Sequence, residues 1–198
     1  MTVDETTSLN NVVRNEFDLL TIPKSPRVKM HPAHMAEIDE IYRLINKHIP
    51  TTVAPPSTMK TVMMLNRNSV FVFRRHGEIV GVYALLVLTA LGLERLLVGE
   101  FSGLDPEFSV LATRLMTPAA IYQWMIVAPG VAAEGIRHVS VFLREPLYRH
   151  ANLFGRPVTE GGLRFALSTG FSPIGKAQLG ELYRYVRLVN RNALAQAA

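Results

Sequence analysis

Apolar residues recur at helical spacing in the segment that follows Pro32. Isoleucines stand at positions 38, 41, 45 and 49, and acidic and basic side chains occupy most of the positions between them. A repeat of three and four residues places these isoleucines on one face of a helix. Pro32 suits a first helical turn, and Pro50 prevents continuation. The pattern therefore predicts an amphipathic helix between the two prolines.

The next segments predict a second helix and a β-hairpin. Ser57 can cap a helix that runs to about Arg67. Val70–Arg75 and Glu78–Leu88 are rich in β-branched and aromatic residues, and they flank the turn formed by His76 and Gly77. The two strands should therefore pair with each other.

The rest of the chain alternates between strand-like and helix-like segments. We expect an edge strand at 27–30, a helix at 89–98, an exposed loop at 99–109, strands at 119–127 and 152–158, helices at 131–145 and 160–169, and closing strands at 171–174 and 181–188. Residues 1–26 read as a loose leader with a short helix at 11–20, and 191–198 as a tail. This order predicts one α/β domain over residues 27–190.

Length and composition exclude several classes of protein. A chain of 198 residues is of single-domain size. Its longest nearly uninterrupted apolar run, Ile79–Leu93, is shorter than the roughly 20 residues of a membrane span. Asp4 and Glu5 stand where a signal peptide is basic, so we expect a soluble, cytoplasmic protein. Without cysteine, the chain has no disulfide, cysteine–metal site or thiol nucleophile.

Positive charge is concentrated in the last third of the sequence. Residues 135–198 hold nine basic and three acidic side chains, and eight of the nine are arginine. Arginine suits forked contacts with phosphate, so a phosphate-bearing ligand is one interpretation and a solvated basic surface is the other. Nucleic-acid binding is a third, less favoured function class, because no basic tract or RNA-binding aromatic pattern is present. The six histidines form no metal-binding motif, and hydrolase, Walker and Rossmann signatures are missing.

Three segments in this order resemble the GNAT superfamily of CoA-dependent N-acyltransferases. They are VFVFRRHGEIVGVYAL (Val70–Leu85), VAPGVAAEGI (Val127–Ile136) and GGLRFALSTGFSPI (Gly161–Ile174). The resemblance covers about residues 27–190 and implies a mostly antiparallel twisted sheet flanked by helices. It also implies acetyl-CoA or another acyl-CoA as the cofactor.

The resemblance implies where that cofactor lies. The backbone of Met125, Ile126 and Val127 would pair with the pantetheine amides in a gap between the fourth and fifth strands. A strand that leads into a helix N-terminus favours an anion. The phosphate contacts would come from this turn and the start of its helix, namely Val131, Ala132, Ala133, Gly135, Ile136 and Arg137.

This turn departs from the family pattern at several positions. Val131 or Ala132 stands where the family has Arg or Gln, and Arg137 stands where a small residue is usual. Glu134 adds a negative charge beside the expected phosphate. A turn of this kind also forms in an ordinary strand–helix connection that binds no ligand.

The resemblance implies three candidate catalytic residues. Glu100 is the best available carboxylate for removing the ammonium proton of an acceptor. Tyr122 and Gln123 lie on the expected fourth strand, where one of them must face the cleft. Ala166 occupies the position at which many family members carry a tyrosine that protonates the CoA thiolate.

The implied function is transfer of an acyl group, acetyl by default, from CoA to an amine of a small molecule or peptide by direct attack. The alternative is a non-catalytic module that binds acyl-CoA or a protein partner. A longer-chain N-acyl synthase is a minor alternative, because the apolar Ile79–Leu93 segment and several methionines leave room for a longer acyl chain. The acceptor stays open, as does a homodimer.

Overall fold

A single seven-stranded sheet organises the computed structural model, which describes residues 27–177 and 180–187. Its spatial order is β1-β2-β3-β4-β5-β7-β6. The strands are β1 (Lys29–Pro32), β2 (Val70–Arg75), β3 (Glu78–Leu88), β4 (Ala120–Val127), β5 (Asn152–Gly155), β6 (Ser172–Ala177) and β7 (Gly180–Tyr185).

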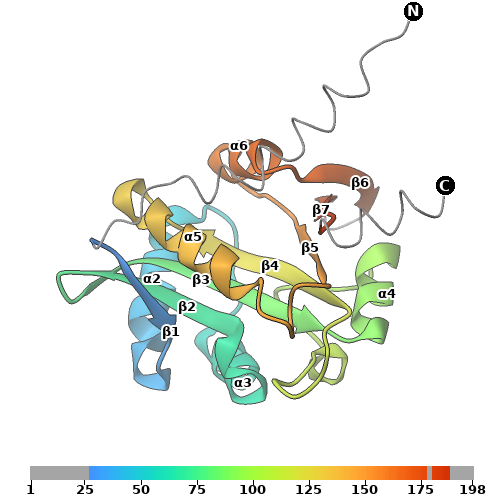
Figure 1. Ribbon diagram of the computed structural model, residues 1–198, viewed down its shortest axis with the longest axis horizontal. Helices are drawn as coiled ribbons and strands as arrows, with labels where there is room; N and C mark the ends of the chain where they lie inside the picture. Colours follow the sequence, from blue (N-terminus) through green and yellow to red (C-terminus); the bar gives the residue numbers. More distant parts are fainter. Residues whose placement is uncertain (1–26, 178–179, 188–198) are drawn as a thin grey trace, which may run out of the picture.

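Strands β4 and β5 run parallel, and the other neighbouring pairs are antiparallel. The expected α/β class with a mostly antiparallel sheet is therefore confirmed. In Figure 1, β4 and β5 start side by side and then diverge towards α6 (Glu160–Ser168).

Helices cover both faces of this sheet. The remaining α-helices are α2 (Ile38–His48), α3 (Pro56–Leu65), α4 (Ala90–Val98) and α5 (Ala133–Phe142). One core cluster joins α5 and α6 to the face that carries Tyr83 and Ile121. Two other clusters join the remaining helices to the opposite face. We call these the α5/α6 face and the α2–α4 face.

Most of the predicted elements are present, and the hairpin has the predicted bounds. His76 and Gly77 both have positive φ, at 53° and 89°, as a type I′ turn requires. The helix expected after Pro32 begins with a short 3-10 turn (Met35–Glu37) and continues as α2. The repeat of three and four residues buries Ile38, Ile41 and Ile45 on one side of this helix.

Several boundary predictions were wrong, among them the closing strand expected at 181–188, which ends at Tyr185. Helix α3 begins at Pro56 with Pro55 at its N-cap, so Ser57 does not cap it. The helix expected at 131–145 is shorter, because a 3-10 turn (Gly130–Ala132) precedes α5 and α5 ends at Phe142. The strand expected at 152–158 ends at Gly155, where β5 leaves β4. The leader, the helix at 11–20 and the tail lie outside the described residues.

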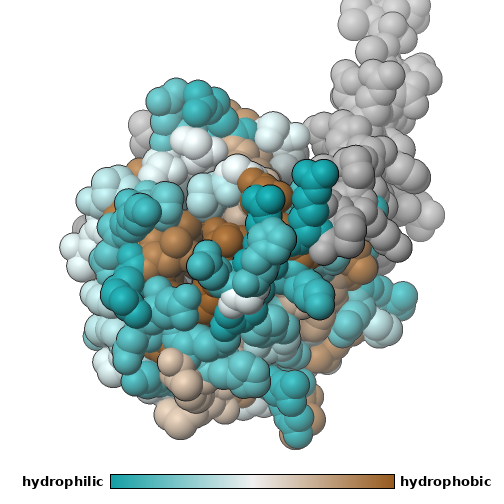
Figure 2. Space-filling view, turned by 90° about the vertical axis from the view of Figure 1, so that its left-hand side faces the viewer, coloured by the Kyte–Doolittle hydropathy of each residue, from teal (hydrophilic) through white to brown (hydrophobic). Residues whose placement is uncertain are grey.

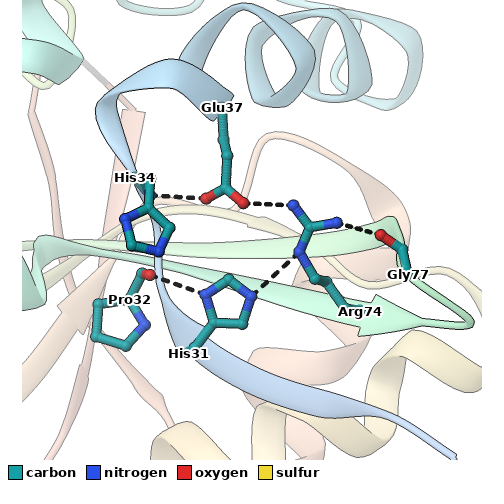
Figure 3. A network of polar contacts seen from close by, with 6 residues as sticks. All are labelled: His31, Pro32, His34, Glu37, Arg74 and Gly77. Carbon is teal, nitrogen blue, oxygen red and sulfur yellow. Dashed lines mark hydrogen bonds and ion pairs between the residues drawn. The ribbon is translucent and has the colours of Figure 1, made fainter.

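A polar network ties the first strand to the hairpin (Figure 3). The Arg74 guanidinium forms an ion pair with Glu37 and donates to the carbonyl of Gly77, and its Nε lies 3.1 Å from His31 Nε2. The Glu37 carboxylate also accepts from the His34 N–H at 2.7 Å. Arg74 therefore holds β1, the 3-10 turn and the hairpin end together.

No helix in the described part of the chain is long and apolar enough to cross a membrane.

Candidate functional site

Strand β4 extends beyond the last residue that pairs with β5. The last pair in the register joins Gln123 to Gly155, whereas β4 continues to Val127. Four residues of β4 therefore have no partner on the β5 side. In an extended strand, alternate N–H and C=O groups point to each neighbour, so part of this edge offers unpaired backbone groups.

A β-bulge lies where the two strands separate. Ala84 pairs with Met125 and the next residue, Leu85, pairs with Gln123, so Trp124 is the extra residue of β4. The Trp124 indole N–H donates to the carbonyl of Gly103 at 2.6 Å. The bulge turns both Trp124 and Met125 towards the α2–α4 face, where they pack in its core clusters.

The separation produces a cleft of about 460 Å³. This volume is in the range of small-molecule binding sites. Residues from β4, β5, the turn before α5, α6, β7 and the end of α2 line it. The side of the molecule towards which β4 runs shows a recess of hydrophobic residues bordered by hydrophilic ones (Figure 2).

The N-terminus of α5 reaches this cleft through a tightly packed turn. Within the turn, the Ala132 N–H donates to the carbonyl of Pro129 at 3.1 Å, and the Ala133 N–H points at the carbonyls of Gly130 and Val131. These two amides are already used inside the chain. The amides of Gly130 and Val131 come before any intrahelical acceptor, as the first N–H groups of a helix do.

The structure separates the predicted cofactor-binding residues into two groups. Met125, Ile126, Val127, Ala133 and Ile136 line the cleft. The other predicted residues, Val131, Ala132, Gly135 and Arg137, do not. Ala132 and Gly135 are buried against the sheet, and their small size allows α5 to approach it closely.

The predicted catalytic residues do not converge on one point. Gln123 lines the cleft, whereas Tyr122 and Glu100 do not. Tyr122 is buried on the α2–α4 face, where its ring packs edge-on against Phe101. Glu100 is exposed in the connection after α4. Ala166 lines the cleft, so no hydroxyl stands at that position of α6.

Gln123 is positioned by a buried tyrosine. Its Nε2 donates to the hydroxyl of Tyr83 at 2.5 Å. Burial raises the pKa of Tyr83 far above its usual value, so this phenol stays neutral. Gly155 leaves room for the Gln123 amide oxygen, which would lie only 3.3 Å from a Cβ atom at that position.

Sequence reasoning missed three ionisable residues that line the cleft, namely His48, Arg156 and Tyr183. His48 is exposed at the end of α2, and Arg156 directly follows β5. The hydroxyl of Tyr183 donates to Glu181 at 2.7 Å, and this bond raises the pKa of Tyr183. These three residues come together only through contacts between distant segments, including strand pairing, for which the sequence carries no motif. Among the described residues that line the cleft, none is Asp or Glu.

In comparisons by sequence, no family model and no curated protein matches this chain. Solved structures are similar in fold. The GphF GNAT-like decarboxylase in complex with isobutyryl-CoA is 17% identical, with a TM-score of 0.58 over 80% of this chain and 98% of that one. The loading GNATL domain of CurA from Lyngbya majuscula is 11% identical, with a TM-score of 0.59 over 80% of this chain and 97% of that one.

A third similar structure is the acetyl transferase from Salmonella typhimurium that modifies the N-terminal serine of ribosomal protein L7/L12. It is 10% identical, with a TM-score of 0.53 over 83% of this chain and 98% of that one. At these identities, the likeness concerns the fold.

Proposed function

We propose that this chain, which has the fold of the GNAT acetyltransferases, is a CoA-dependent N-acyltransferase. The observation that carries this proposal is the separation of β4 from β5 beyond Gln123 and Gly155. The resulting cleft joins an unpaired strand edge to a helix N-terminus. A ligand with both amide and phosphate groups, such as CoA, matches these two features.

The reaction we propose is direct transfer. A neutral amine attacks the thioester carbonyl carbon, the C–N bond forms, and the C–S bond breaks to release the thiolate of CoA. Unpaired N–H groups of β4 beside the bulge are suited to stabilise the oxyanion that develops. Holding both reactants in one cleft supplies much of the rate enhancement.

Two protons must move in this reaction, and the cleft offers a group for each. His48 is suited to accept the ammonium proton of the acceptor, directly or through water. Tyr183 lines the cleft together with Ala166, and its hydroxyl would exchange its bond to Glu181 for one to the departing sulfur, in place of the missing tyrosine of α6. Because Glu100 lies outside the cleft lining, we place the proton acceptor at His48.

Calorimetric titration with CoA, acetyl-CoA and octanoyl-CoA, with ATP as a control anion, tests the cofactor. We expect saturable binding that ATP does not reproduce. No binding of any CoA species at low salt would refute the proposal. Acetyl-CoA turnover with a panel of amines then tests the chemistry, and His48→Gln and Tyr183→Phe should each lower kcat by roughly 10²-fold or more.

A matched pair of variants at Ala133 tests whether the phosphates of CoA lie at the N-terminus of α5. Ala133 is exposed at the start of α5 and lines the cleft. Ala133→Glu places a negative charge at a helix N-terminus, which favours the helix but repels a phosphate. It should weaken CoA binding without loss of Tm, whereas Ala133→Gln should bind nearly as well as the wild type.

One observation favours a non-catalytic acyl-CoA-binding module as the second candidate. The described lining of the cleft has no carboxylate, and Ala166 offers no acid. Such a module would bind acyl-CoA but give no turnover with any amine, and His48→Gln would leave its affinity unchanged.

A further inference from the structure

Arg156 is a half-buried arginine at the point where the two central strands separate. It directly follows β5 and lines the cleft. Its guanidinium lies 5.9 Å from the centre of the Tyr122 ring, and its Nη1 lies 3.4 Å from the carbonyl oxygen of Phe101. An aromatic face and a main-chain carbonyl therefore fix the orientation of this group.

The remaining edge of the guanidinium makes no well-formed hydrogen bond within the chain, although Arg156 lies close enough to the Tyr122 hydroxyl to offset part of the rise that burial causes in the pKa of Tyr122. Arg156 Nε and Nη2 are both buried, and neither has a hydrogen-bond acceptor. A buried N–H without an acceptor costs free energy, and more so when it is charged. Nε and Nη2 form one side of the guanidinium fork, whose two parallel N–H groups match the two oxygens of a carboxylate.

The chain does not supply this carboxylate from the cleft. None of the described lining residues is Asp or Glu. A second arginine strengthens the positive charge on this face. Arg184 pairs with Phe154 across β5 and β7, two residues from Arg156 along β5, and its buried Nε also has no acceptor.

The position of Arg156 shows from which side an anion would reach it. Tyr122 and Phe101 pack with Val62 and Leu96 on the α2–α4 face. The N-terminus of α5, suited to the cofactor phosphates, lies on the α5/α6 face. An anion bound by Arg156 therefore belongs to a group that meets the cofactor from the opposite face of the sheet.

We propose that Arg156 binds the carboxylate of the acceptor, which makes the acceptor an amine that also carries a carboxylate, as amino acids do. This inference rests on the proposed acyltransferase function. The same fork would also bind a carboxylate at the end of a dicarboxylic acyl group. The shared chemistry is one carboxylate on the Nε/Nη2 edge, and the experiment separates the two sources.

The first arm measures the acceptor. Turnover of acetyl-CoA is followed with a panel of L-amino acids and with their carboxamides. We expect kcat/KM to be roughly 10- to 100-fold higher for the carboxylates, the range of one charged, bidentate contact. Arg156→Gln should bring this ratio close to one, and Arg156→Lys, which keeps the charge without the fork, should restore part of it.

The second arm measures the acyl group. Calorimetric Kd values are compared for succinyl-CoA and butyryl-CoA, which differ in a terminal carboxylate. A preference for succinyl-CoA that Arg156→Gln removes would assign the carboxylate to the acyl donor and overturn the acceptor assignment. Equal affinities, together with the acceptor preference of the first arm, support the proposal.

A third measurement separates this inference from the proposed function. Calorimetric binding of the same amino acids and carboxamides to the chain without cofactor needs no turnover. A carboxylate preference lost in Arg156→Gln supports Arg156 even if no acyl-CoA binds, which would refute the acyltransferase proposal alone. If carboxylates and carboxamides bind equally, or if Arg156→Gln keeps the preference, the inference is overturned.

The matched control is Arg164→Gln, which removes the same charge from the exposed surface of α6. It should keep both the carboxylate preference and the Kd for acetyl-CoA. The Tm of each variant is measured first, so that a folding defect is not taken for lost binding.

Discussion

The ring of Phe73 occupies the space that a side chain at Gly135 would need. A Cβ atom at Gly135 would lie well under 3.0 Å from three atoms of this ring. Phe73 is fully buried. The same ring leaves no room for a side chain at Gly81, where a Cβ atom would lie 2.8 Å from it. Phe73 thus packs between the sheet and α5 and limits how closely the first turn of α5 approaches the sheet.

We expect Gly135→Ala to destabilise the fold by roughly 1–3 kcal/mol, because the ring cannot move within a packed core. The change should also weaken CoA binding, since α5 would shift away from the cleft. Urea denaturation and calorimetry measure the two effects. Gly161→Ala is the control for stability only, because Gly161 itself lines the cleft. A Cβ atom at Gly161, also in the first turn of its helix, meets nothing within 4 Å. An equal loss of stability in Gly135→Ala and Gly161→Ala would contradict the packing role of Phe73 against Gly135.

The fluorescence of Trp124 should report ligand binding. It is the only tryptophan in the sequence, and it lines the cleft at the bulge of β4. A ligand that enters the cleft will change the surroundings of the indole. Titration with acetyl-CoA should therefore give a saturable change in emission with the calorimetric Kd. A Trp124 signal that responds equally to ATP would show that the change is not specific to the cleft.

Tyr83→Phe should destabilise the protein by about 1–2 kcal/mol, because the half-buried Gln123 loses the acceptor of its Nε2. Gln123 would also lose its fixed orientation at the start of the cleft. Tyr148→Phe is a control of the same kind, since the hydroxyl of Tyr148 accepts only a longer bond, of 3.4 Å, from Asn68. Urea denaturation should show the smaller loss there, and the reverse order would contradict the assignment.

The ion pair of Glu37 predicts a pH-dependent contribution to stability (Figure 3). Burial raises the pKa of Glu37, but the bonds from the His34 N–H and Arg74 outweigh it, so the pKa lies below the ordinary 4.5. Because the pKa of Glu37 is lower in the folded state than in the unfolded state, its carboxylate stabilises the fold at pH values above the unfolded-state pKa. This stabilisation is lost as the pH falls through the folded-state pKa.

Glu37→Gln should therefore cost roughly 1 kcal/mol at pH 7. The difference from the wild type should shrink as pH drops below 4.5, where the wild-type carboxylate takes up a proton. Urea denaturation of both proteins at several pH values measures this. A difference that stays constant with pH would show that the charge of Glu37 is not its source.

Local patterns in the sequence determined most of the secondary structure. The hairpin and α2 follow from β-branched runs, a His-Gly turn and an isoleucine repeat, which act over a few residues. The element order was enough to indicate the fold class, since few arrangements pack such a series of strands and helices. The same patterns could not predict that Ser57 does not cap α3 or that β5 ends at Gly155. Both boundaries depend on neighbouring segments of the fold.

The candidate site was decided by tertiary structure. Gln123 and Gly155 are 32 positions apart, and only their pairing fixes where β4 and β5 separate. The sequence indicated Glu100 and Tyr122, but neither lines the cleft, because Glu100 is exposed in the connection after α4 and Tyr122 is buried on the α2–α4 face. The pairing of β5 with β4 and β7 brings Arg156 and Tyr183 to the cleft instead. Local sequence determines which segments become strands and helices. Which side chains share a cleft depends on contacts between distant segments, and no local pattern encodes those contacts.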